Sequence, residues 1–121
     1  MPSRVLVVDD DSDMRHAIQE VLLDHGLSVA LAADGREALE HADSAEPQLV
    51  ILDITLPIID GPGVADGLQA RYGGTVPILA ITADGRAAQK ARRVGAYAFL
   101  RKPFELDDLV RLVQRGLAAA G

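Results

Sequence analysis

The stretch VLVVDDD at residues 5–11 decides the fold, because four consecutive apolar residues run directly into three carboxylates. Val5–Val8 does not alternate apolar with polar residues. An uninterrupted apolar run of this length is typical of a strand that is buried on both faces of a parallel sheet. Asp9–Asp11 then marks the point where the chain leaves the core. The stretch therefore predicts a buried parallel strand with carboxylates at its carboxyl end.

Four more apolar runs of the same kind follow along the chain. They lie at Val29–Ala33, Leu49–Leu52, Val76–Ile81 and Ala96–Leu100. Between the runs, apolar residues recur with the spacing that places them on one face of a helix. The residues that carry this period are Met14, Ile18, Val21, Leu22, Ala38, Leu39, Ala42, Val64, Leu68, Ala70, Ala87, Ala91, Val94, Leu106, Leu109, Val110, Val113 and Leu117. We therefore expect strand and helix to alternate five times.

This alternation predicts an α/β fold with helices on both faces of the sheet. Eight units would be needed for a closed barrel, so we expect an open, doubly wound sheet of five parallel strands in the flavodoxin-like order 2-1-3-4-5. Such a sheet binds ligands outside the carboxyl ends of its strands, at the switch point between strands 1 and 3. No linker or low-complexity tract interrupts the pattern, so residues 1–121 are expected to form one domain.

Helix boundaries are predicted from residues that cap or break helices. Ser12 or Asp13 is expected to cap the first helix, and Gly26 to end it. Pro62 suits the first turn of the third helix. The fourth helix, at residues 86–94, is rich in Ala and Arg and has few large apolar anchors. We expect this helix to be short or mobile.

Composition excludes several classes of function. The chain has 121 residues, no cysteine and a formal net charge of -6. Without cysteine it cannot form a disulfide framework or a thiolate metal site, and it fits a reducing, cytoplasmic setting. The excess of 18 acidic over 12 basic residues argues against direct binding of nucleic acid. The short apolar run before Asp9 is too short for a signal peptide or a membrane span, so no membrane contact is expected.

Polar side chains follow four of the predicted strands, and the topology brings them to one edge. Asp9 and Asp10 follow the first strand, Asp53 the third, Thr82 the fourth and Lys102 the fifth. Carboxylates that approach within a few ångströms repel each other unless a cation lies between them. Oxygen ligands in an open site suit Mg²⁺, while a hydroxyl and an ammonium group can hold a phosphate-sized anion. A carboxylate in such a pocket can attack phosphorus.

Four segments carry a resemblance to a known family. They are VVDDD (Val7–Asp11), ILDITLP (Ile51–Pro57), ITADG (Ile81–Gly85) and GAYAFLRKPF (Gly95–Phe104). Together they resemble the response-regulator receiver domains of two-component signalling, in the family's order and each at the carboxyl end of a predicted strand. The resemblance covers essentially the whole chain. Each fragment alone is weakly specific, but the four in order are a strong signal.

The resemblance implies the roles of the acidic residues. Asp53 would accept the phosphoryl group. Asp9 and Asp10 would be the acidic pair that binds Mg²⁺ together with Asp53, and the backbone carbonyl of Thr55 would complete the protein ligands. On this reading the metal site and the phosphoacceptor share one carboxylate.

The resemblance also implies a switch. Thr82 and Lys102 would contact the phosphoryl group, and Phe99 would be the aromatic residue that turns when Thr82 is drawn toward the phosphate. That movement would change the face formed by the fourth helix, the fifth strand and the fifth helix. From the residues alone, the apolar run Ala96–Leu100 is expected to bury Phe99, so its switch role rests on the resemblance.

By the same resemblance, Thr55, Ala83 and Asp84 border the phosphoryl group and tune how fast water removes it. The phosphoryl donor would be a sensor histidine kinase or a histidine phosphotransfer protein, and the receiver would control an output protein or domain. The chain is then a phosphoacceptor rather than an enzyme, with self-catalysed phosphotransfer and autodephosphorylation. The switch face is also a candidate for contact between two copies of the chain.

Four alternative functions fit the residues less well. A receiver-like interaction module that works without phosphorylation would lack the acceptor or the lysine, and this chain has Asp53 and Lys102. A Mg²⁺-dependent phosphohydrolase carries a second acid two residues after its nucleophile, where Thr55 stands. A flavin-binding domain would have a loop rich in Ser, Thr and Gly in place of three carboxylates. Asp9–Asp13 has the spacing of an EF-hand loop, but Met14 stands where that loop needs glycine.

Overall fold

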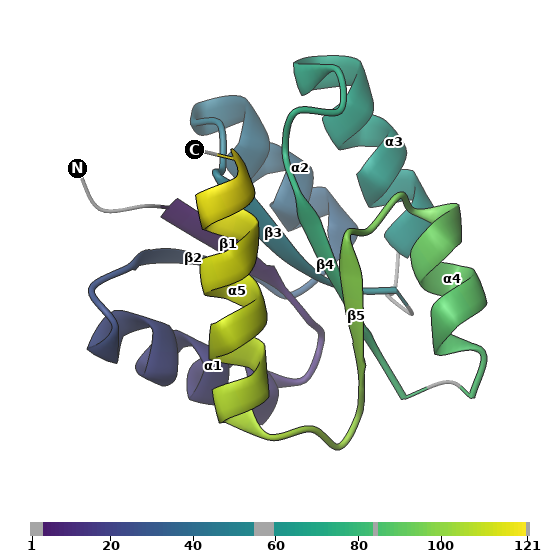
Figure 1. The fold of residues 1–121 in the computed structure, drawn as a ribbon. Helices are drawn as coiled ribbons and strands as arrows, with labels where there is room; N and C mark the ends of the chain where they lie inside the picture. Colours follow the sequence, from purple (N-terminus) through teal and green to yellow (C-terminus); the bar gives the residue numbers. More distant parts are fainter. Residues whose placement is uncertain (1–3, 55–59, 84, 121) are drawn as a thin grey trace.

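Five parallel strands and five helices alternate along the chain, as the sequence predicts (Figure 1). This computed structural model describes residues 4–54, 60–83 and 85–120. The strands are β1 (Arg4–Val8), β2 (Ser28–Ala32), β3 (Leu49–Asp53), β4 (Ile78–Thr82) and β5 (Ala98–Arg101). The helices are α1 (Ser12–Asp24), α2 (Gly35–Ser44), α3 (Gly61–Tyr72), α4 (Ala87–Arg93) and α5 (Leu106–Ala120).

The sheet has the predicted order β2-β1-β3-β4-β5, and each neighbouring pair of strands is parallel. Helices α1 and α5 cover one face, and α2, α3 and α4 cover the other (Figure 1). In the register, Val8 lies beside Leu52, and Leu52 beside Ala80. The carboxyl ends of β1, β3 and β4 therefore finish at the same edge. The predicted doubly wound α/β fold is confirmed.

Burial differs between the central and the outer strands. Every residue of β3 and β4 is buried, whereas β5 alternates half-buried and exposed residues. Phe99 is 42% exposed, so the expectation that its apolar run would bury it is wrong. The reason is that β5 lies at the edge of the sheet, and the neighbouring helix α4 buries only the small side chains of Ala87 and Ala91. At seven residues, α4 is short, as predicted.

Asp11 caps the first helix, and the prediction of Ser12 or Asp13 is wrong. The Asp11 carboxylate accepts hydrogen bonds from the backbone N–H groups of Asp13 at 3.0 Å and Met14 at 3.3 Å. The helix starts one residue earlier than expected because the side chain before Ser12 already satisfies its first N–H groups. Gly26 follows the helix with a φ of 77°, as predicted. Asp11 thus serves the helix and leaves its two acidic neighbours to the edge of the sheet.

The described residues contain no helix that is long and apolar enough to cross a membrane. The longest, α5, has 15 residues and carries acidic residues in its first turn. It packs on the sheet through buried residues such as Leu109 and Val113. Its amphipathic pattern therefore serves the core of this fold.

Gly116 allows Tyr97 to lie against α5, and this contact gives a first prediction. A Cβ at Gly116 would lie 2.5 Å from the Tyr97 hydroxyl oxygen and 2.7 Å from Leu49 Cδ1. We expect Gly116→Ala to lower the free energy of unfolding by about 1–3 kcal/mol, because the added methyl group overpacks this contact. Urea denaturation measures the change, and Gln114→Ala, at an exposed site on the same helix, is the control. Equal stability of both variants would contradict the prediction.

Candidate functional site

Three carboxylates meet at the carboxyl edge of the sheet. Carboxylate oxygens of Asp9, Asp10 and Asp53 lie within 4.8 Å of one another. Asp9 follows β1 and is fully buried, Asp53 is the last residue of β3 and is 5% exposed, and Asp10 is exposed. The structure thus brings together the three acidic residues predicted from the sequence, at the switch point between β1 and β3.

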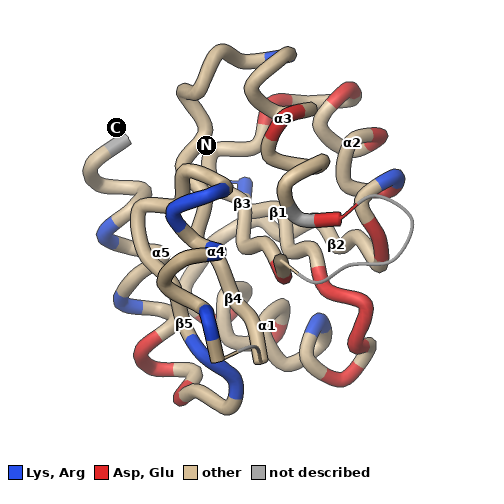
Figure 2. Tube along the Cα trace, turned by 90° about the vertical axis from the view of Figure 1, so that its right-hand side faces the viewer, with Lys and Arg blue, Asp and Glu red and all other residues tan. Residues whose placement is uncertain are grey.

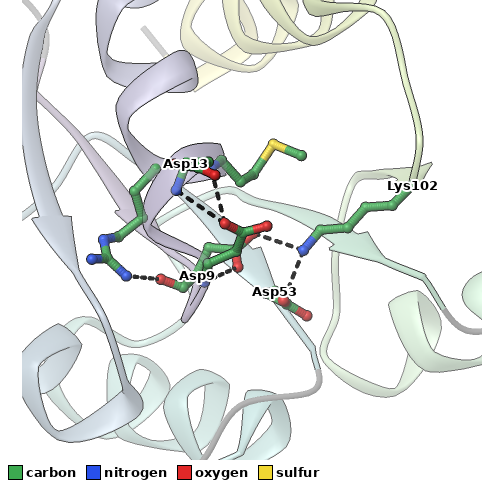
Figure 3. Close-up of polar contacts among 7 residues, drawn as sticks. Asp9, Asp13, Asp53 and Lys102 are labelled. Atoms are coloured by element: carbon green, nitrogen blue, oxygen red, sulfur yellow. Dashed lines mark hydrogen bonds and ion pairs between the residues drawn. The ribbon is translucent and has the colours of Figure 1, made fainter.

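Lys102 reaches into this cluster from the segment that follows β5. Its Nζ lies 2.8 Å from Asp9 Oδ2 and donates a hydrogen bond to Asp53 Oδ2 at 3.1 Å (Figure 3). Its backbone N–H donates to the carbonyl of Thr82 at 2.8 Å, and its peptide bond to Pro103 is cis. Burial lowers the pKa of Lys102, but the contacts with Asp9 and Asp53 outweigh it and raise the pKa above its usual value. Lys102 is therefore a charged ammonium group between two carboxylates.

The Asp9 carboxylate is held from several sides. Its Oδ1 accepts a hydrogen bond from the Asp11 N–H at 2.9 Å, and its backbone N–H donates to the Ala32 carbonyl at 3.1 Å. Its Oδ2 lies 2.8 Å from the Lys102 ammonium group and has no other partner among the described residues. A buried carboxylate oxygen with a single partner can still accept a further cation, because each such oxygen has two lone pairs.

The composition of the cluster fits a divalent cation. Three carboxylates and one ammonium group leave two formal negative charges in a partly buried site, and such charges repel unless a cation neutralises them. All of the side-chain donors are oxygens, and the site is open on the side of exposed Asp10. Mg²⁺ binds in such sites through a few carboxylates and keeps several water molecules. Asp9, Asp10 and Asp53 can therefore hold Mg²⁺.

The remaining predicted site residues lie around this cluster or outside the described part of the chain. Thr82 is the last residue of β4 and is fully buried, and Ala83 directly after it is exposed. Phe99 lies on the adjacent strand β5, beside the small residue Ala80 of β4. Thr55 and Asp84 lie outside the described residues. The topology thus places a buried hydroxyl and an exposed aromatic ring on neighbouring strands next to the acidic edge.

Sequence reasoning missed Arg15. Its Nη1 donates a hydrogen bond to the backbone carbonyl of Asp9 at 2.8 Å. Arg15 lies in the first turns of α1, so it ties this helix to the end of β1 and fixes the backbone that carries the buried carboxylate. The sequence did offer a signal for this contact, because Arg15 stands one turn into the helix that follows Asp9–Asp11.

Comparison with known proteins relates the whole chain to one family. A family model described as the response regulator receiver domain matches residues 5–114. Among curated proteins, the response regulator MprA of Mycolicibacterium vanbaalenii is 41% identical over 112 residues, which cover 91% of this chain and 48% of MprA. The chain spans about half the length of the curated relatives it matches.

Solved structures show the same fold. The chemotaxis protein CheY4 of Vibrio cholerae matches with a TM-score of 0.88 and 35% identity, over 97% of this chain and 100% of CheY4. The receiver domain of the sensor histidine kinase PA1611 from Pseudomonas aeruginosa matches with a TM-score of 0.88 and 29% identity, over 98% of this chain and 99% of that domain. That structure has a magnesium ion coordinated in its active site cleft.

Proposed function

Because this chain belongs to the response regulator receiver domain family, we propose that it receives signals by accepting a phosphoryl group on Asp53. The observation that carries this proposal is the position of the Asp53 carboxylate. It is 5% exposed, 3.1 Å from the Lys102 ammonium group, and within 4.8 Å of the carboxylates of Asp9 and Asp10. Family members act with histidine kinases, so the donor is a sensor histidine kinase or a histidine phosphotransfer protein.

The phosphoryl transfer uses the residues at the edge of the sheet in simple roles. An oxygen of Asp53 bonds to phosphorus while the bond from phosphorus to the donor imidazole nitrogen breaks, and that nitrogen keeps the electron pair and takes a proton from solvent. Lys102 stands beside Asp53 and neutralises the charge on the phosphoryl oxygens. Arg15 and the Asp11 N–H hold Asp9 in place, so the acidic edge is organised before the donor arrives. The chain acts as a phosphoacceptor that promotes its own phosphorylation.

Asp9, Asp10 and Asp53 are the residues that would hold Mg²⁺, with the backbone carbonyl of Thr55 as a further proposed ligand. When bound, the metal supplies positive charge to the phosphoryl oxygens. The single described partner of the buried Asp9 Oδ2 and the excess of carboxylates over ammonium groups in the cluster support this assignment. The magnesium ion in the PA1611 receiver domain supports it from a similar structure.

We place the switch in Thr82 and Phe99. A new aspartyl phosphate next to the end of β4 offers acceptor oxygens to the Thr82 hydroxyl, and movement of that side chain leaves space on the side of β5. Phe99 is 42% exposed, so it gains apolar burial by turning into that space. The face formed by α4, β5 and α5 then changes shape, and an output protein or domain detects the change.

The proposal also covers the loss of the phosphoryl group, the extent of the domain and its cellular compartment. Ala83, exposed directly after Thr82, leaves water a path to the phosphoryl group, and Thr55 and Asp84 tune its rate of loss. We propose that residues 1–121 act as one receiver domain. The chain has no cysteine, which fits a domain that works in the reducing cytoplasm.

Intact mass spectrometry tests the acceptor assignment. After incubation with Mg²⁺ and acetyl phosphate, the wild-type chain is expected to gain the mass of one phosphoryl group. The reason is that Lys102 stands beside Asp53 and neutralises the charge on the phosphoryl oxygens. Asp53→Asn is expected to gain none. Asp66→Asn, an exposed carboxylate on α3, is the matched control and is expected to behave as wild type. An unchanged wild-type mass, or an equal gain in Asp53→Asn, would overturn the proposal.

A further inference from the structure

Charge is divided unevenly along the chain. Fifteen of the 18 acidic residues and four of the 12 basic residues precede residue 85. Three acidic and eight basic residues follow it, so the formal charge is -11 in the first part and +5 in the second. In the fold, the positive part forms α4, β5 and α5, which lie side by side, whereas most of the acidic residues lie toward α1, α2 and α3 (Figure 2). A protein of net negative charge thus has one basic face.

Several cations on this basic face are available to a partner. Among the residues that the structure describes, four of its arginines are exposed and form no ion pair with another described residue. They are Arg92 and Arg93 on α4, Arg101 on β5 and Arg115 on α5. By contrast, Arg111 pairs with Asp108 on the same helix, and Lys102 is engaged at the acidic edge. The cations come from α4, β5 and α5, so all three elements of this face carry positive charge.

Two aromatic rings lie within this basic face. Tyr97 is 38% exposed and Phe99 is 42% exposed, and they are two of the three exposed large apolar side chains in the described part of the chain. The Tyr97 hydroxyl donates to the Leu112 carbonyl at 2.7 Å, and burial raises its pKa to about 12, so the ring is fixed against α5 and stays neutral. Aromatic residues and arginine are enriched at protein–protein interfaces, so this face has the composition of an interface.

A second copy of the chain is a poor occupant for this face. A twofold dimer sets the same patch against itself, and here that would bring two positive patches together. The exposed Arg101 on the edge strand β5 also opposes pairing of two such strands. Nucleic acid is disfavoured because the charge of -11 over the rest of the chain repels phosphates.

We propose that the α4–β5–α5 face binds an acidic protein segment whose apolar side chains cover Tyr97 and Phe99. The arginines select the partner by its charge, and the two rings provide the apolar contact. This inference rests on the proposed function in one respect, because the same face is the proposed output of the Thr82–Phe99 switch. It adds the chemistry of the partner, which the family membership leaves open.

Two synthetic amphipathic helical peptides test this proposal. One carries Leu on one face and Glu on the other, and the second has Lys in place of each Glu. In NMR titrations of the wild-type chain, the acidic peptide is expected to shift the amide resonances of β5 and α5. Its affinity is expected to fall as salt is added. The basic peptide is expected to leave these resonances unchanged. The double variant Arg101→Glu/Arg115→Glu is expected to weaken binding at least about tenfold.

Arg36→Glu on α2 is the matched control, because Arg36 is an exposed arginine outside the basic face. This variant is expected to bind the acidic peptide with the affinity of wild type. Equal binding of both peptides, shifts confined to other elements, or no effect of the double variant would overturn the inference. So would binding of a DNA duplex, or a dimer in sedimentation that the double variant dissociates. The titration uses the unphosphorylated chain, so a failure of Asp53 to accept a phosphoryl group leaves this test intact, and the reverse also holds.

Discussion

Replacing Lys102 by alanine is expected to slow phosphorylation of Asp53 by about 10²–10³-fold, the usual cost of removing one group that stabilises developing charge. Among the described residues, Lys102 forms an ion pair with the proposed acceptor, with its Nζ 3.1 Å from Asp53 Oδ2. Its side chain is only 18% exposed, so water cannot fully replace it. The rate of appearance of the phosphorylated mass, with acetyl phosphate at saturating Mg²⁺, measures the effect.

A measurement of Mg²⁺ affinity distinguishes a role of Lys102 in phosphoryl transfer from a role in maintaining the structure of the site. Without Lys102 the three carboxylates lose their ammonium partner, so calorimetric titration of Lys102→Ala with Mg²⁺ is expected to show an affinity equal to or higher than that of wild type. Lys90→Ala, which removes the other lysine of the chain, is the control and should phosphorylate at the wild-type rate. A collapse of Mg²⁺ affinity in Lys102→Ala would mean that the cation site has been misplaced.

Leu22→Ala is expected to lower the free energy of unfolding by about 2–5 kcal/mol, a large part of the 5–15 kcal/mol that small domains possess. The Leu22 side chain is fully buried between α1 and the sheet, where it packs with residues of β1 and β3. Its truncation removes apolar contacts and leaves a cavity that the close-packed core cannot fill. Urea denaturation, followed by far-ultraviolet circular dichroism, measures the loss.

The next residue offers the matched control. Leu23 lies on the same helix but is 52% exposed, so Leu23→Ala removes the same atoms with little loss of packing. It is expected to change the free energy of unfolding by no more than about 0.5 kcal/mol. Similar losses in both variants would show that helix formation, rather than burial against the sheet, determines the cost at these positions.

The strand order and the central strands could be predicted because their sequence signal is strong. Val5–Val8 and Leu49–Leu52 are apolar without interruption, and only strands covered on both faces tolerate that pattern. The fifth strand spans Ala98–Arg101, about two residues later than the apolar run Ala96–Leu100 predicts. The exposure of Phe99 was not predictable, because it depends on how far α4 covers β5. The apolar pattern of β5 carries no information about the packing of that helix.

The site could be predicted to the same extent as the topology. Asp9, Asp53 and Lys102 converge because each lies at the carboxyl end of a strand of one parallel sheet, and the register then brings their atoms within a few ångströms. Which residue caps the N-terminus of α1 was not predictable with the same certainty, since Asp11, Ser12 and Asp13 are all good caps. The hydrogen bond of Arg15 depends on the rotation of that helix, which the sequence pattern does not specify.

The uneven division of charge has a kinetic consequence. A basic face on one part of the fold and an acidic excess on the rest give the molecule a permanent electric dipole moment (Figure 2). An approaching charged protein exerts a torque on such a dipole, so the two molecules turn toward a productive orientation before they touch. Partners of opposite charge are thereby guided to different poles of the domain. Added salt should slow these encounters while leaving the lifetimes of the complexes nearly unchanged.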